Sequence, residues 1–173
     1  EPEPEVELAP YQTTTISKII IDFGYPWPRE KKPKKERINA IANQIKNFLS
    51  SRPTTTSLNP IILVGEDLDG VLKRLGDLCP SYVNEVEVYV GKIEELLPSS
   101  SSSIYLSPDS PNLISMTAKP PSLLIIGGII DRNPTPGRSL KRAEEINISH
   151  GCLDLESINF DNLTNNEPLN VDT

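Results

Sequence analysis

Short apolar runs separated by amphipathic segments are the feature that most constrains the fold of this chain. The runs lie within segments 16–23, 61–64 and 123–131, and the first contains three consecutive isoleucines, Ile19–Ile21. Continuous apolar runs of this length are typical of strands buried on both faces, as in a parallel sheet. Shorter strands are expected at 86–90, 104–106 and 152–155.

Between these strands, apolar residues recur at helical spacing. Helices are predicted over Glu36–Leu49, from Leu68 through Leu75, over Ile93–Leu97, and from Leu140 through Ile146. Another helix is expected after Ser110, with Ser110 as the N-cap and Pro111 at the first helical position.

Alternating strands and helices predict an α/β domain, with a mainly parallel sheet and helices on both faces. In such sheets a ligand usually binds beyond the carboxyl ends of the strands. Ser107 and Asp131 follow two predicted strands and are expected at that edge. Gly127 and Gly128 interrupt the apolar run before Asp131 and would let another group approach the backbone closely.

The charge is unevenly distributed. The net charge of −7 argues against a nucleic-acid-binding protein. However, six cations fall within residues 29–37: Arg29, Lys31, Lys32, Lys34, Lys35 and Arg37. A solvated charged loop and an RNA-binding surface are both open interpretations of this run. Residues 1–15 form a Pro-interrupted acidic segment that is expected to be a disordered tail, which leaves 16–173 as one domain.

Several classes of site are not indicated. Cys79 and Cys152 are far apart and are expected to be reduced thiols of an intracellular protein. His150 is the only histidine, so no metal site is expected, and a place in a surface loop is predicted for it. Asp22-Phe23-Gly24 matches the magnesium-binding triad of protein kinases, but their other motifs are missing. No apolar run is long enough to span a membrane.

Two longer motifs are more specific. The segment Tyr105–Leu113 resembles the Y-L-(T/S)-x-D-S-P-N segment of the SPOUT-class methyltransferases that modify N1 of the purine at tRNA position 9. The segment Ile125–Asn133 resembles their I-I-G-G-(L/I)-V-D-(R/H/K)-N segment. Ile20–Tyr25, the residues around Gly137, and Ile148–Leu155 match further family segments in the same order.

This resemblance implies a SPOUT fold with a trefoil knot, S-adenosylmethionine as cofactor and tRNA as substrate. It implies a cofactor site drawn from Leu106, Ser107, Gly127, Gly128, Asn133, Gly137, Lys141, Cys152, Leu153 and Leu155. RNA contacts are expected from Lys31, Lys32, Lys34, Lys35, Arg132 and Arg138.

Asp131 is the candidate catalytic residue. The N1 atom of guanine carries a proton at neutral pH, and a carboxylate can accept it. The N1 atom of adenine has an available lone pair and needs no base, so the preferred purine stays open. A turn-capping role is the alternative for Asp131.

The family continues beyond the segment that begins at Leu169 into a final helix, which this sequence does not contain. Either this sequence is a fragment of a longer chain or its trefoil knot is incomplete, and a catalytically silent RNA- or protein-binding subunit is the alternative function. We expect a monomer or a chain that depends on an accessory domain. A cytoplasmic location is expected, with nuclear and organellar locations left open.

Overall fold

The computed structural model describes residues 18–52, 60–98, 102–114, 121–130 and 135–154. Seven strands form one sheet in the order β3-β2-β1-β6-β4-β7-β5, and every neighbouring pair is parallel. The strands are β1 (Lys18–Asp22), β2 (Ile61–Gly65), β3 (Val86–Val90), β4 (Ser103–Leu106), β5 (Leu113–Ile114), β6 (Leu123–Gly127) and β7 (His150–Leu153). The predicted parallel sheet is confirmed.

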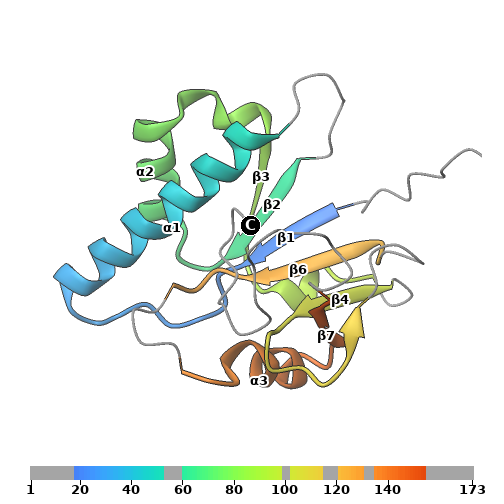
Figure 1. The fold of residues 1–173 in the computed structure, drawn as a ribbon. Coiled ribbons are helices and arrows are strands. Elements are labelled where there is room, and N and C mark those ends of the chain that lie inside the picture. Colours follow the sequence, from blue (N-terminus) through green and yellow to red (C-terminus); the bar gives the residue numbers. More distant parts are fainter. Residues whose placement is uncertain (1–17, 53–59, 99–101, 115–120, 131–134, 155–173) are drawn as a thin grey trace, which may run out of the picture.

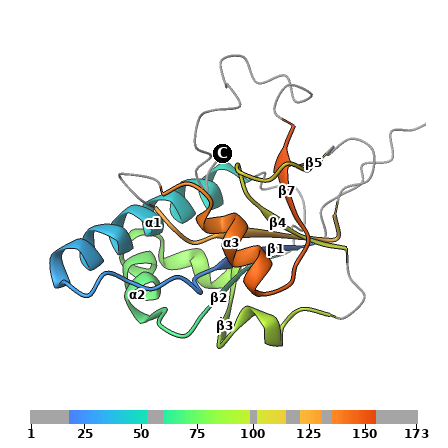
Figure 2. The ribbon, with the colours of Figure 1, turned by 90° about the horizontal axis from the view of Figure 1, so that it is seen from below.

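Helices cover both faces of this sheet, as predicted (Figure 1). The helical elements are α1 (Lys31–Ser51), α2 (Asp69–Leu78) and α3 (Arg138–Glu145), with short 3-10 turns at Pro80–Asn84 and Ile93–Glu95. The helices α1 and α2 pack on one face, whereas α3 lies over the other face, toward the viewer in Figure 2.

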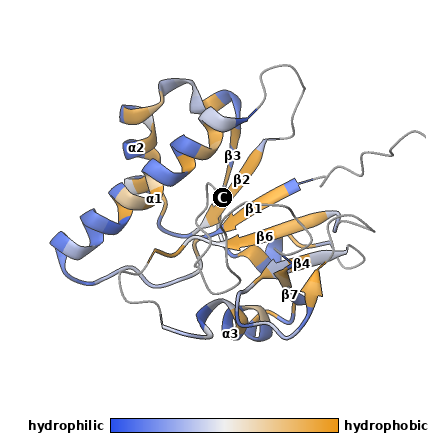
Figure 3. Cartoon of the chain, in the orientation of Figure 1, coloured by the Kyte–Doolittle hydropathy of each residue, from blue (hydrophilic) through white to orange (hydrophobic). Residues whose placement is uncertain are grey.

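Alternation along β1 separates the two hydrophobic cores. Ile21 packs with Ile41 and Ile45 of α1, whereas its neighbour Ile20 packs with Ala143 of α3. Successive side chains of a strand point to opposite faces, so a run of isoleucines fills both cores. Figure 3 shows this pattern as apolar colour along the central strands and hydrophilic colour on the first turns of α1.

The helix α1 begins earlier than its apolar spacing predicted. It starts at Lys31 rather than Glu36, so the basic run lies on its first turns and the loop interpretation is wrong for Lys31–Lys35. Lysine is a good helix former, and Pro33 is tolerated because amide groups in the first turn have no intrahelical partner. The first helical bond runs from the amide of Lys34 to the carbonyl of Glu30.

The helix predicted after Ser110 is wrong. The Ser110 hydroxyl accepts a hydrogen bond from the Asn112 amide, at 3.2 Å, within a turn. The chain then enters β5, and the Asn112 carbonyl accepts from the Cys152 amide of β7 at 2.7 Å. Pairing between strands distant in the sequence outweighs the local capping pattern here. The knot and the disordered tail stay predictions, since residues 1–17 and 155–173 lie outside the described residues.

Candidate functional site

Three segments that are distant in the sequence meet at the carboxyl edge of the sheet. Ser107 follows β4, and its amide donates to the Gly151 carbonyl of β7 at 2.9 Å. Its hydroxyl accepts from the Ser139 hydroxyl of α3 at 2.9 Å. Asp109 reaches the loop before α3, where it accepts from the Gly137 amide at 2.8 Å. The edge is therefore tied together by side chains as well as by strand pairing.

The structure thus gathers five of the predicted cofactor residues at one edge: Leu106, Ser107, Gly137, Cys152 and Leu153. Ser107 is only 2% exposed, and its hydroxyl also accepts from the Asp109 amide. Its hydrogen bonds therefore hold the edge together. Gly137 has a φ of +78°, and a Cβ atom there would meet no atom within 4 Å. A side chain at Gly137 would be strained by the backbone but not by crowding.

His150 lies in β7 rather than in the predicted surface loop. Its Nδ1 is 2.8 Å from the Ser110 hydroxyl, and its carbonyl accepts from the Asn112 side-chain amide at 3.3 Å. The Asp109–Asn112 part of the motif therefore forms the turn that connects β4 to β5.

Cys152 is a free thiol at the same edge. Burial raises the pKa of this thiol, and the charges of Asp109 and Asp154 raise it further. A thiol with a raised pKa stays protonated at neutral pH and is a poor nucleophile. Cys152 therefore suits packing rather than covalent chemistry.

The structure gives Gly127 and Gly128 a packing role. A Cβ atom at Gly127 would lie 2.9 Å from the Tyr25 hydroxyl, and one at Gly128 would lie 2.9 Å from the Phe23 ring. Gly128 also turns the chain at the end of β6, since its amide donates to the Asp22 carbonyl at 2.7 Å. The groups that approach these glycines belong to the protein itself, and cofactor contact there stays a prediction.

Sequence reasoning missed a buried network around Asp22. Its side chain is 1% exposed and accepts from the Arg142 Nε at 3.0 Å and the Tyr105 hydroxyl at 2.9 Å. The Tyr105 hydroxyl also lies 2.6 Å from the Tyr25 hydroxyl. The Arg142 guanidinium occupies the space that a side chain at Gly24 would need. The Asp22-Phe23-Gly24 triplet therefore contains a structural aspartate. The sequence feature that could have indicated it is a single acidic residue at the end of an apolar strand.

The pKa of both tyrosines, Tyr25 and Tyr105, is raised. Burial is the main cause for each, and it raises the pKa of Tyr25 to about 12. Tyrosines of the unfolded chain lose their protons near pH 10, so above that pH the unfolded chain binds fewer protons than the folded one. The stabilisation by the protonated Tyr25 hydroxyl is therefore complete below about pH 10 and is lost as the pH rises through 12.

We expect the free energy of unfolding to fall between pH 10 and 12, and to fall less steeply in Tyr25→Phe. The phenylalanine has no proton to lose. Chemical denaturation at a series of pH values measures this slope, and Tyr82→Phe, in the turn before β3, is the control. Equal slopes in Tyr25→Phe and the unchanged protein would contradict the buried-hydroxyl explanation.

Comparison with known proteins decides the family. Residues 5–165 match the family model described as tRNA (guanine(9)-N(1))-methyltransferase TRM10/TRM10A. The chain belongs to the TRM10/TRM10A family. The resemblance seen in the two motifs is thereby confirmed.

Mouse tRNA methyltransferase 10 homolog C is 42% identical over 62 residues, which are 36% of this chain and 14% of the mouse protein. The human homolog C is 37% identical over 62 residues, again 36% of this chain and 15% of the human protein. The matched segment is thus a small part of these relatives.

Solved Trm10 structures share the fold. The crystal structure of spTrm10(74) has a TM-score of 0.65 and 21% identity, covering 92% of this chain and 84% of that one. The full-length spTrm10–SAH complex has a TM-score of 0.58 and 22% identity, covering 88% and 83%. The dual specific Trm10 of Thermococcus kodakaraensis has a TM-score of 0.57 and 20% identity, covering 79% and 75%. The predicted SPOUT-like architecture is confirmed.

The remaining residues predicted to be catalytic, cofactor-binding or RNA-binding, apart from the lysines of α1, divide into two groups. Asp131, Arg132, Asn133 and Leu155 lie outside the described residues, so their roles stay predictions. Lys141 and Arg138 lie on α3. The Lys141 side chain is 77% exposed and faces Glu145 at 3.8 Å, and the Arg138 guanidinium lies 5.5 Å from the centre of the Tyr25 ring. Arg138 therefore lies against the network around Asp22.

The predicted RNA-binding lysines lie on a different helix from α3, on the other face of the sheet. Lys31, Lys32, Lys34 and Lys35 are on α1, which covers the opposite face of the sheet (Figure 1). Lys34 donates to Asp67, which follows β2, at 2.7 Å. The lysines thus approach the carboxyl edge from the other face.

Within the described ranges, no group of three or more His, Cys, Asp or Glu side chains is placed to hold a metal ion. The helices of this part of the chain are also too short or too polar to cross a membrane.

Proposed function

We propose that this chain forms the S-adenosylmethionine-binding core of a tRNA methyltransferase that acts on N1 of the purine at position 9. One observation carries the proposal: the β4 end, the loop before α3 and β7 are hydrogen-bonded into one edge. Membership of the TRM10/TRM10A family supports it. So does the fold shared with spTrm10, whose full-length form was crystallised with SAH.

The chemistry of the edge suits such a cofactor. Half-buried Leu106 and Leu153 end neighbouring strands, and Leu113 of β5, 69% exposed, pairs with Cys152 at the same edge. Apolar side chains of this kind suit the faces of an adenine ring. Asp109 and the backbone groups around Gly137 offer polar partners for the ribose and amino acid parts. Apolar walls with a few polar groups are typical of small-molecule sites.

The cofactor would supply a methyl group on a sulfonium, and the residues of this chain would position the purine and handle its proton. Holding two reacting groups in line supplies much of the rate of such a displacement. Asp131 follows β6 in the sequence by four residues, so the proposal assigns it the proton of guanine N1. Adenine would not need that step.

The cofactor site is tested by Leu153→Ala. We expect S-adenosylhomocysteine to bind on the order of tenfold more weakly, because a buried leucine side chain contributes about 1.5–3 kcal/mol. Isothermal titration calorimetry with the full chain measures this. Val90→Ala is the matched control. Val90 is the last residue of β3, as Leu153 is the last residue of β7, but β3 lies at the other end of the sheet. Failure of the unchanged protein to bind, or equal weakening in both variants, would overturn the assignment of this edge.

A further inference from the structure

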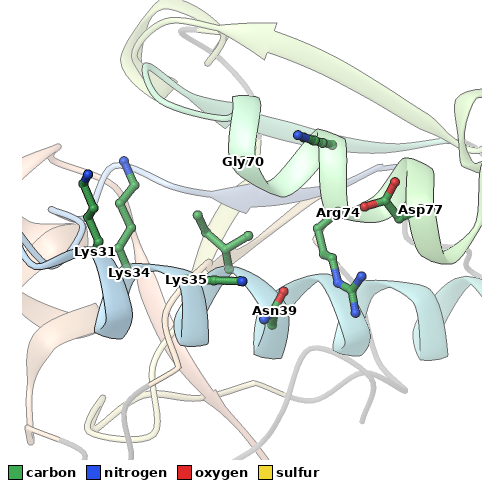
Figure 4. Close-up of a pocket in the computed structure, with 9 residues that line it drawn as sticks. Lys31, Lys34, Lys35, Asn39, Gly70, Arg74 and Asp77 are labelled. Carbon is green, nitrogen blue, oxygen red and sulfur yellow. The ribbon is translucent and has the colours of Figure 1, made fainter.

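A pocket of about 690 Å³ lies between α1 and α2, on the face opposite α3 (Figure 4). Five cationic side chains line it. They are Lys31, Lys34 and Lys35 of α1 and Lys73 and Arg74 of α2, with Asp77 the acidic residue among the lining side chains. The pocket is therefore strongly cationic in a chain whose net charge is −7.

Tight helix packing forms the floor of this pocket. A Cβ atom at Gly70 would lie 2.6 Å from the Ile38 side chain, so the glycine lets α2 approach α1. Figure 4 shows Arg74 extending from α2 toward α1. Its Nε atom is buried and, among the described residues, has no hydrogen-bond acceptor. A buried donor without an acceptor costs free energy, so an anion that enters the pocket would gain by accepting from it.

The charges around the pocket repel one another. The first turn of α1 contains no acidic residue, and no side chain caps its amino end. The positive end of the helix dipole therefore lies beside the lysines, an arrangement that favours a bound anion. Asp67 neutralises Lys34 in part, through a pair whose side chains are 36% and 54% exposed. Lys31, Lys35, Lys73 and Arg74 remain to attract a ligand.

We propose that this pocket binds backbone phosphates of the RNA substrate, with Lys73 and Arg74 as contacts in addition to the lysines of α1. The α1 residues that line it span 31–39, about 12 Å at the helical rise of 1.5 Å per residue. That length exceeds one phosphate group and suits successive phosphates of a strand. The inference rests on the proposed function for the identity of the RNA.

The position of the pocket supports this assignment. Asp67 follows β2 at the carboxyl edge of the sheet, where its side chain pairs with Lys34 and its backbone carbonyl accepts from the Trp27 indole at 3.0 Å. The Lys34 end of the pocket therefore lies at the same edge as the candidate cofactor site. RNA held there would run toward that edge.

The salt dependence of tRNA binding tests the proposal. Each phosphate contact contributes roughly 0.7–0.9 to the slope of log affinity against log salt. We expect the double variant Lys73→Gln/Arg74→Gln to bind tRNA more weakly and to lower this slope by roughly 1 to 2. Arg74→Lys, which keeps the charge, should retain most of the slope. The control pair is Lys18→Gln/Lys46→Gln, on β1 and α1 outside the pocket, which should leave the slope unchanged.

Three further readouts separate the explanations. Affinity for S-adenosylhomocysteine should be the same in all variants, so loss of the cofactor alone would count against the proposed function and not against the pocket. Inorganic phosphate at millimolar concentration should compete poorly with tRNA if the pocket recognises successive phosphates. A double variant that folds, as judged by its melting temperature, and keeps the full slope would overturn the proposal. So would an unchanged protein with no affinity for tRNA.

Discussion

Asp131→Asn should slow methylation of a tRNA with guanine at position 9 by roughly 10²–10⁴-fold, the usual contribution of a general base. The amide cannot accept the N1 proton, so deprotonation must come from solvent, and the rate should rise more steeply with pH. Single-turnover methylation across a range of pH values measures both effects. Affinity for S-adenosylhomocysteine should be retained, because Asn keeps the shape of Asp.

A tRNA with adenine at position 9 is the internal control for this substitution. Its N1 atom carries no proton at neutral pH, so the same change should have a much smaller effect. Equal and small effects on both purines would remove Asp131 from the chemistry and leave it as a turn residue.

Arg142→Met is expected to lower the free energy of unfolding by about 3–5 kcal/mol. The Arg142 side chain is 16% exposed and Asp22 is 1% exposed, so the substitution leaves a buried carboxylate without its cation. Domains of this size are stabilised by only about 5–15 kcal/mol in total. Urea denaturation followed by circular dichroism measures the change.

Two variants control this result. Lys141→Gln removes an exposed ion pair with Glu145 on the same helix, and pairs of this kind contribute less than about 1 kcal/mol. Asp22→Asn/Arg142→Met removes both charges and should be more stable than Arg142→Met alone. If Arg142→Met lost no more stability than Lys141→Gln, the buried Asp22–Arg142 pair would not make the expected contribution to stability.

The central strands were predictable because their apolar runs have to be buried on both faces. Strand β3 was located at its observed residues, and the carboxyl-edge position of Ser107 was also predicted correctly. The start of α1 was not predicted correctly, since its first turn contains lysines and a proline and therefore shows no hydrophobic periodicity. Likewise, Ser110 and Pro111 form a good capping pattern, but pairing of β5 with β7 decides their structure.

The candidate site was predictable in part. Family-like motifs predict that Leu106, Ser107, Gly137, Cys152 and Leu153 lie together, and the structure places them at one edge of the sheet. The Asp22–Arg142 pair could not be found in this way, because its members are 120 residues apart. The contribution of α2 to the cationic pocket was missed for a different reason, since Lys73 and Arg74 belong to no charge run in the sequence.

The most direct test is to incubate the full chain with S-adenosylmethionine and an unmodified tRNA, and to analyse the nucleosides by mass spectrometry. The proposed function predicts one N1-methylated purine per tRNA, located at position 9 by a reverse-transcription stop. A tRNA that stays unmethylated, although the protein binds both S-adenosylhomocysteine and tRNA, would contradict it. That result would identify the chain as a catalytically silent RNA-binding member of the family.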